Sequence, residues 1–198
     1  MKKGMMLLVV LSIFVLSTVT FGEEGKRSSF REHQKGIIQQ HRQQQQAENK
    51  EFRQGLKEMK PEERQSAIKS HRDQQYKENT AFHVQLHQQN MGYLKERLAN
   101  NKKLSDAQKT ELINFFESQY QENIKYREQR HNDNVAFFEK IANDSSLTQE
   151  QKKQALKEHR EAQKAENQKH REEQKSKRKA ERGKIHDEVK EQNKQSQR

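Results

Sequence analysis

Along most of this chain, apolar residues and a recurrent set of polar ones are spaced alternately three and four positions apart. Such steps place residues on one face of a helix, as the a and d positions of a heptad do. The pattern therefore predicts long helices whose contacting seams are apolar at the ends and polar in the middle. The seam residues are Ile38, His41, Gln45, Glu48 and Phe52; Ile68, His71, Gln75, Glu78 and Phe82; Leu112, Phe115, Gln119, Glu122 and Tyr126; and Leu156, His159, Gln163, Glu166 and His170.

A polar nonamer lies inside each seam. It reads HRQQQQAEN from 41, HRDQQYKEN from 71, FFESQYQEN from 115 and HREAQKAEN from 159. We expect one copy per helix, with its Arg and Asn on the stripe beside the seam. Folding the first two copies together about the turn at 60 gives an antiparallel, self-complementary register. That register sets Arg42 near Glu78 and Glu48 near Arg72, and we predict it for the first hairpin only.

The helix ends are marked by a few residues. Pro61 suits a first helical position, and Ser105 and Thr148 each stand three residues before a Gln, which is the spacing of a capping box. We predict helices over 27–58, 61–100, 104–142 and 147–193. The expected fold class is all-α, with four long antiparallel helices joined by short turns in a coiled-coil-like thin bundle or cradle that can self-associate.

Composition explains why the bundle should be thin. Of the 198 residues only 28% are hydrophobic and 35% are charged, whereas globular domains have about 45–50% apolar residues with Gly included. Disorder and thin helical packing are the two states open to such a chain. Ionised Glu or His in a dry seam would cost several kcal/mol. The helices must therefore part around their middles, hold water there, or pair His and Arg with Glu.

Apolar residues gather near the predicted turns and thin out toward the C-terminus. We expect Tyr93, Leu94 and Leu98 to pack against Leu112 and Phe116. Beyond about residue 170 the seam loses its support. This divides the chain into a signal segment at 1–22, a repeated long-helix domain at 23–170 and a basic tail at 171–198, helical or disordered, in which only Ile185 and Val189 could dock.

The first 22 residues differ from the rest. Lys2 and Lys3 precede an apolar run from Met5 to Val19 that Ser12, Ser17 and Thr18 interrupt. This is typical of a cleaved secretory signal peptide, with the cut after Gly22, and the alternative is a transmembrane anchor, which needs about 20 apolar residues. Cleavage would lower the formal net charge from +11 to +9 and leave a soluble chain in the periplasm with no transmembrane segment.

Candidate chemistry is sparse. The chain has no Cys, no glycine-rich phosphate loop and no GxSxG motif, so we expect no enzyme and no required cofactor. His83 and His87 stand four apart on one predicted helix face and could share a zinc, nickel or copper ion, although such a pair arises readily among nine His. The basic tail could contact a polyanion, or it could be an ordinary solvated helix face.

The two capping boxes also carry a family resemblance. The stretches LSDAQKTEL and LTQEQKKQAL resemble the LTxxQ signature of the Spy/CpxP group of periplasmic stress proteins. The matching residues are Leu104, Ser105, Gln108, Leu147, Thr148 and Gln151. The resemblance implies a secreted, all-helical protein that dimerises and holds unfolded or aggregation-prone clients without ATP; related members sense metals or restrain envelope-stress signalling.

Three functions are therefore open. The leading hypothesis is a periplasmic, ATP-independent, chaperone-like protein that binds non-native clients on a basic, amphiphilic helical surface and forms a homo-oligomer, expected to be a dimer. The alternatives are a structural or scaffold coiled-coil protein of the cell envelope and a metal-binding envelope-stress sensor.

Overall fold

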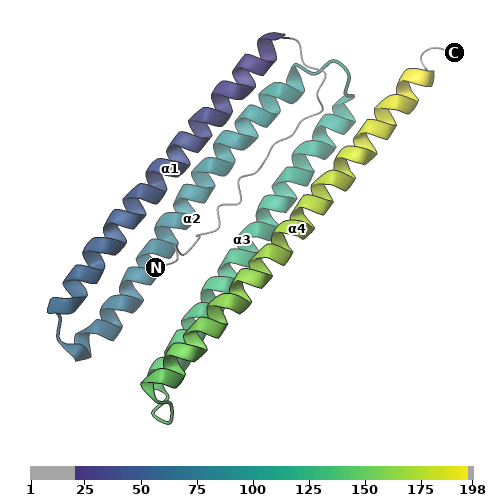
Figure 1. Ribbon diagram of the computed structural model, residues 1–198. Coiled ribbons are helices and arrows are strands. Elements are labelled where there is room, and N and C mark those ends of the chain that lie inside the picture. Colours follow the sequence, from purple (N-terminus) through teal and green to yellow (C-terminus); the bar gives the residue numbers. More distant parts are fainter. Residues whose placement is uncertain (1–20, 196–198) are drawn as a thin grey trace. The chain divides into compact units, whose positions relative to one another are not determined.

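A computed structural model describes residues 21–195 of this protein as four long helices (Figure 1). They are α1 (Phe21–Glu58), α2 (Pro61–Ala99), α3 (Asp106–Asn143) and α4 (Gln149–Gln195), and no strand occurs in this part of the chain. The predicted all-α fold with four helices is confirmed. Twenty of the 22 residues of the predicted signal segment, 1–20, lie outside the described residues, and α1 begins six residues before its predicted start.

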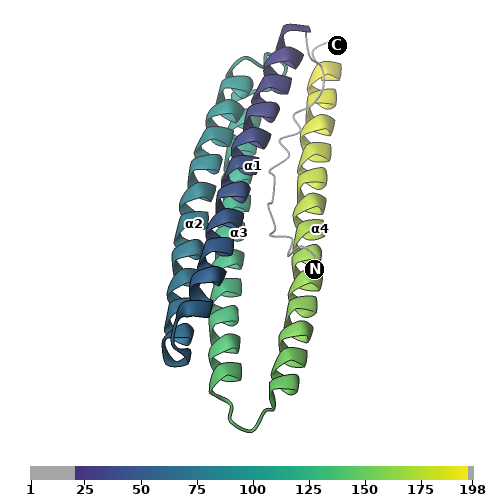
Figure 2. The same ribbon diagram turned by 60° about the vertical axis from the view of Figure 1, so that its left-hand side comes forward.

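The helices belong to two compact units. One unit holds α1 and α2 as far as Gln89, and the other holds the rest of α2 from Asn90 with α3 and α4. Within each unit the two long helices run antiparallel side by side (Figures 1 and 2). We call the pair α1 and α2 the first hairpin and the pair α3 and α4 the second hairpin.

Both predicted capping boxes are present. At the start of α3 the Ser105 backbone N–H donates to Gln108 Oε1 over 3.0 Å, and the Gln108 N–H donates to Ser105 Oγ over 3.3 Å. Thr148 and Gln151 exchange the same two bonds at the start of α4, over 2.8 and 3.2 Å. These bonds occupy backbone N–H groups that a helix start otherwise leaves unpaired.

The apolar core lies in the second unit and is small. Leu94 and Leu98 of α2 are buried there against Leu112 and Phe116, as the sequence predicts. The full set of buried cluster members is Met91, Leu94, Leu98, Leu104, Leu112, Phe116 and Ile185. This cluster ties the last ten residues of α2 to both helices of the second hairpin.

The C-terminal part of α4 departs from the expectation of a lone or frayed tail beyond residue 170. α4 continues to Gln195, Ile185 is fully buried in the apolar cluster, and Val189 packs against it. Gln174 is also buried, at 2% exposure. The prediction that support ends near 170 is wrong because α4 reaches back along the whole of α3 to the end of α2, where apolar residues are again available.

Candidate binding surfaces

The seam of the first hairpin is held by two ring clamps, each made of a His on one helix and an Asn and an aromatic residue on the other. His41 Nε2 lies 3.1 Å from Asn79 Oδ1, and its ring stacks on Phe82 with centroids 3.9 Å apart. His71 repeats this toward Asn49 (3.2 Å) and Phe52 (3.9 Å). The His41–Asn79 and His71–Asn49 contacts each lie one residue from a predicted alignment, Arg42 with Glu78 or Arg72 with Glu48. The predicted antiparallel register of this hairpin is therefore confirmed.

The second hairpin carries two more ring clamps. His159 lies 2.9 Å from Asn134 Oδ1 and stacks on Phe137 at 3.8 Å. His170 lies 2.8 Å from Asn123 Oδ1 and stacks on Tyr126. Four clamps therefore share one pattern, in which the aromatic residue follows the Asn by three positions.

The amide orientation fixes the proton on three of these imidazoles. Asn49, Asn79 and Asn123 each donate through Nδ2 to the carbonyl four residues earlier, over 2.7 Å. A carbonyl only accepts, so each Oδ1 is the atom turned toward the His. The His Nε2 must therefore donate its N–H, which makes these rings Nε2-protonated when neutral.

The clamps correct the predicted seam. Asn was expected beside the seam and Glu within it, yet Asn49 contacts the opposite helix while Glu48 accepts a hydrogen bond from Gln44 of its own helix. On α1 the residues that are buried or contact the opposite helix are His41, Gln45, Asn49 and Phe52, at steps of four, four and three, whereas the predicted heptad steps were four, three and four. Such a repeat of eleven residues in three turns is close to the period of a straight helix, and it includes Asn49 in place of Glu48. His159 and His170 are also eleven apart.

Cross-helix pairs with Glu do occur in the second hairpin, at its edge. Lys177 donates to Glu122 over 2.7 Å, and Gln174 donates to the same carboxylate over 2.8 Å. Hydrogen bonds from Lys177 and Gln174 hold the pKa of Glu122 below its ordinary value. Arg130 pairs with Glu166 in the same way. The structure therefore pairs polar side chains across the seam, which is one of the three arrangements predicted for its middle. Lys and Arg pair with Glu, as in Lys177–Glu122 and Arg130–Glu166, but each clamp His pairs with an Asn.

Burial shifts two of the imidazoles. The pKa of His170 lies below its ordinary value because burial disfavours the charged ring, although Glu173 and Glu122 oppose the shift. Burial also lowers the pKa of His159, with Arg130 adding to the effect. Both rings are therefore held toward the neutral form that the stacked clamp uses.

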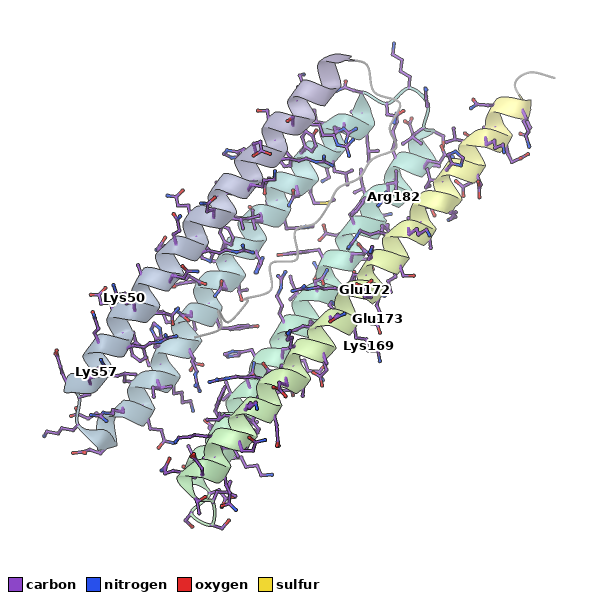
Figure 3. The ribbon with its side chains drawn as sticks, viewed as in Figure 1. Lys50, Lys57, Lys169, Glu172, Glu173 and Arg182 are labelled. Carbon is purple, nitrogen blue, oxygen red and sulfur yellow. The ribbon has the colours of Figure 1, made fainter. Side chains whose placement is uncertain are left out.

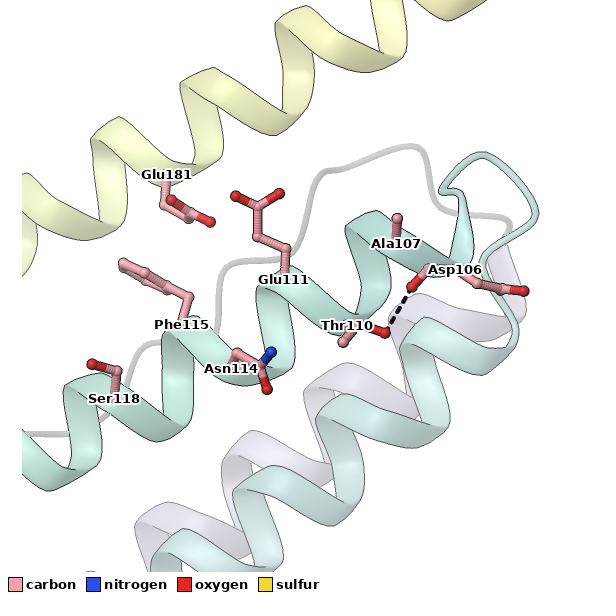
Figure 4. Close-up of a pocket in the computed structure, with 8 residues that line it drawn as sticks. All are labelled: Asp106, Ala107, Thr110, Glu111, Asn114, Phe115, Ser118 and Glu181. Carbon is pink, nitrogen blue, oxygen red and sulfur yellow. Dashed lines mark hydrogen bonds between the residues drawn. The ribbon is translucent and has the colours of Figure 1, made fainter.

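One shallow groove opens along the second hairpin (Figure 4). Its volume is about 870 Å³. The Phe115 ring lies in it between the helices, with the carboxylates of Glu111 and Glu181 beside the ring (Figure 4). Burial and the nearby Glu111 raise the pKa of Glu181, and Lys184 pairs with Glu111. Phe115 was predicted in the seam, but its neighbour Phe116 takes the buried position.

A second groove, of about 270 Å³, opens on the first hairpin. The clamp rings of Phe52 and His71 line it, with Gln74, Gln75 and the carboxylates of Glu48, Glu51 and Glu78. Both grooves thus combine an aromatic ring with acidic side chains, on a protein whose formal net charge is +11. Sequence reasoning did not find the grooves, because they depend on which helices lie side by side.

The remaining surface is densely charged (Figure 3). Lys50 and Lys57 are exposed on α1, and Lys169 and Arg182 are exposed on α4. Glu172 and Glu173 lie exposed between these two basic residues of α4. Large apolar side chains are mostly half-buried; among the described residues Val84 is the one exposed large hydrophobic side chain.

The two candidate metal ligands lie on one helix, as the sequence predicts. His83 and His87 are half-buried on α2. Among residues 21–195 no group of three or more His, Asp or Glu side chains is arranged to hold a metal ion. No helix in the same range is long and apolar enough to cross a membrane.

The LTxxQ-like residues act as helix starts in the structure. Leu104 and Gln108 are buried, and Gln108 Nε2 also donates to Glu188 of α4 over 3.2 Å. Leu147 is half-buried beside Thr148. Comparison with known proteins finds no matching family model, no matching curated protein and no matching solved structure.

Proposed function

We propose that this protein is a periplasmic, ATP-independent, chaperone-like protein that binds unfolded or aggregation-prone clients on its amphiphilic helical surface. The observation that carries the proposal is the pair of shallow grooves, each with an aromatic ring beside carboxylates. A groove of this kind accepts one apolar or basic side chain of an extended segment without demanding a folded partner.

The polar seams support the same reading. Stability here comes from ring clamps and hydrogen bonds along thin hairpins, so many apolar side chains stay half-exposed in place of filling a closed core. Weak contacts spread over a long surface suit clients that differ in sequence, and the charged surroundings favour rapid encounter. The predicted signal peptide supports the periplasmic location, and the LTxxQ resemblance points to the same class of protein.

The test is a light-scattering assay of client aggregation at low salt. The protein in few-fold excess should suppress aggregation of reduced lysozyme, a basic client. A variant with Glu48→Gln, Glu51→Gln and Glu78→Gln should protect it less, because the groove has lost its charge. The matched control, Glu128→Gln, Glu161→Gln and Glu172→Gln, removes three exposed carboxylates that line neither groove and should protect like the original chain.

Unchanged scattering with the original protein would contradict the proposal and favour a structural or scaffold coiled-coil protein of the envelope. Equal loss in both variants would remove the grooves from the mechanism. Self-association into a dimer is part of the proposal, and sedimentation equilibrium tests it directly.

A further inference from the structure

The basic residues of α4 form a single continuous row. Fourteen residues of α4 are buried or half-buried, and ten of them follow one another at steps of three or four along the side that includes its contacts with α3, such as His159, His170 and Ile185. The residue that follows each of them lies about 100° further round the helix. These ten following residues are Lys157, Arg160, Lys164, Gln168, Arg171, Lys175, Lys179, Arg182, His186 and Lys190.

The composition of this row is one-sided. Eight of its ten members are Lys or Arg, and none is acidic. The opposite flank, formed by the ten preceding residues, is mixed: it has four Glu, three Lys and three Ala. An ordinary solvated face would share charges of both signs between its flanks, as paired charges four residues apart stabilise a helix. On the opposite flank Lys177 and Lys184 pair with Glu122 and Glu111 of α3, while the six other acidic residues of α4 lie on neither flank.

The row is long, straight and accessible. From Lys157 to Lys190 it extends about 50 Å at 1.5 Å per residue. Seven of its eight basic members are exposed, and Arg171 is half-buried. We call these eight residues the α4 basic row. α1 carries a similar but shorter run, including Lys50 and Lys57, so α4 offers the longer surface.

We propose that the α4 basic row binds a linear polyanion made of repeated phosphate groups. A line of about eight cations over about 50 Å matches a chain of anions lying along the helix, and binding would be driven by release of counterions. α4 has no Phe, Tyr or Trp, so it has no platform for stacked bases and would recognise only the repeated charge. The row itself holds no apolar residue that could enter a lipid interface.

The inference is independent of client binding, because the grooves and the row use different residues. Its test compares two variants of the purified protein with equal loss of charge. The row variant carries Lys157→Gln, Lys164→Gln, Lys175→Gln and Lys179→Gln. The control carries Lys103→Gln, Lys125→Gln, Lys140→Gln and Lys169→Gln, four exposed lysines outside the row. Circular dichroism checks that both variants keep their helix content.

Fluorescence anisotropy with long-chain inorganic polyphosphate and with an oligothymidylate gives the Kd at several salt concentrations. The original protein should show a slope of log K against log salt near about −5, from about 0.7 per cation engaged on a single strand. The row variant should lose about half of that slope and bind at least about tenfold more weakly. The control variant should keep both.

Comparing the Kd for polyphosphate with the Kd for the oligothymidylate shows whether the row prefers a plain phosphate chain or a nucleic acid. Equal weakening in both variants would show that net charge alone is responsible and would overturn the inference. Row-dependent binding to phosphatidylglycerol vesicles, with no binding of either soluble probe, would overturn it in favour of a membrane surface.

Discussion

The imidazole of His170 lies flat against the ring of Tyr126, with centroids 3.9 Å apart and planes 8° apart. Its Nε2 meets Asn123 at 2.8 Å, and the Tyr126 hydroxyl donates to Asn167 over 2.8 Å. Two planar groups and two amides thus close a polar seam without a large apolar residue. The same clamp occurs four times, which makes it the main device that holds each pair of helices in register.

The clamp hydrogen bond should contribute measurably to stability. Asn79→Ala removes the acceptor of His41 and leaves its half-buried N–H without that partner. We expect the free energy of unfolding to fall by about 1–2 kcal/mol. Urea denaturation followed by circular dichroism measures the change. Lys77→Ala, at an exposed position of α2, is the matched control and should cost under about 0.5 kcal/mol.

The two shifted imidazoles should make the protein less stable in mild acid. Because burial lowers the folded pKa of His159 and His170, the unfolded chain binds the extra protons first. Their contribution to stability is complete above the ordinary His pKa of about 6.5 and is lost as the pH falls through the folded values. Thermal melts between pH 7.5 and 5 should show a falling Tm.

The groups around His170 allow a sharp control for this pH effect. Glu122 and Glu173 favour the charged ring, while Lys177 and Arg127 oppose it. His170→Gln should flatten the part of the profile between about pH 6.5 and 5, where an ordinary His titrates. Gln168→Ala, at an exposed and non-titrating residue of the same helix, should leave the profile unchanged. A profile that His170→Gln does not alter would contradict the assignment.

The capping box of α3 should be stabilising. Ser105→Ala deletes the oxygen that accepts from the Gln108 N–H, and we expect a loss of about 1 kcal/mol in the free energy of unfolding. Ser118→Ala on the surface of the same helix should change it by less than about 0.5 kcal/mol. Chemical denaturation of both variants distinguishes the cap from a general effect of removing a hydroxyl.

Ile185 should anchor the end of α4. Its side chain is fully buried among Leu112, Phe116 and the end of α2. Ile185→Ala should lower the free energy of unfolding by about 2–4 kcal/mol and speed amide exchange over the last turns of α4. Exchange that is already fast in the original chain, and unchanged by the substitution, would show that this end does not dock.

The export prediction is tested by mass spectrometry. Protein recovered from the periplasmic fraction of cells that express the full chain should begin at Glu23, after cleavage behind Gly22. Retention of Lys2 and Lys3 in a membrane fraction would instead support an anchor.

The sequence by itself determined the helices. Scarce Gly and Pro, the caps at Ser105 and Thr148, and the break at Pro61 are local signals, so the predicted ends agree with the structure to within about two residues except at the start of α1. The register of the first hairpin also followed from the sequence, since its two nonamers are equally distant from one turn. The contacts of His159 with Asn134 and Phe137 were not predicted, because these two partners lie outside any nonamer.

What the tertiary structure decided is which side of each helix faces its partner. On α3 the buried residues Phe116, Gln119 and Asn123 keep steps of three and four, but they lie on the face next to the predicted one, so Asn123 is in the seam and Glu122 is at its edge. The same shift of face places Phe116 in the core and Phe115 in a groove. Such shifts depend on contacts between residues up to about 80 positions apart, such as Gln108 and Glu188. The residues near one position in the sequence do not determine those contacts, because the partner of each side chain depends on which helices pack together.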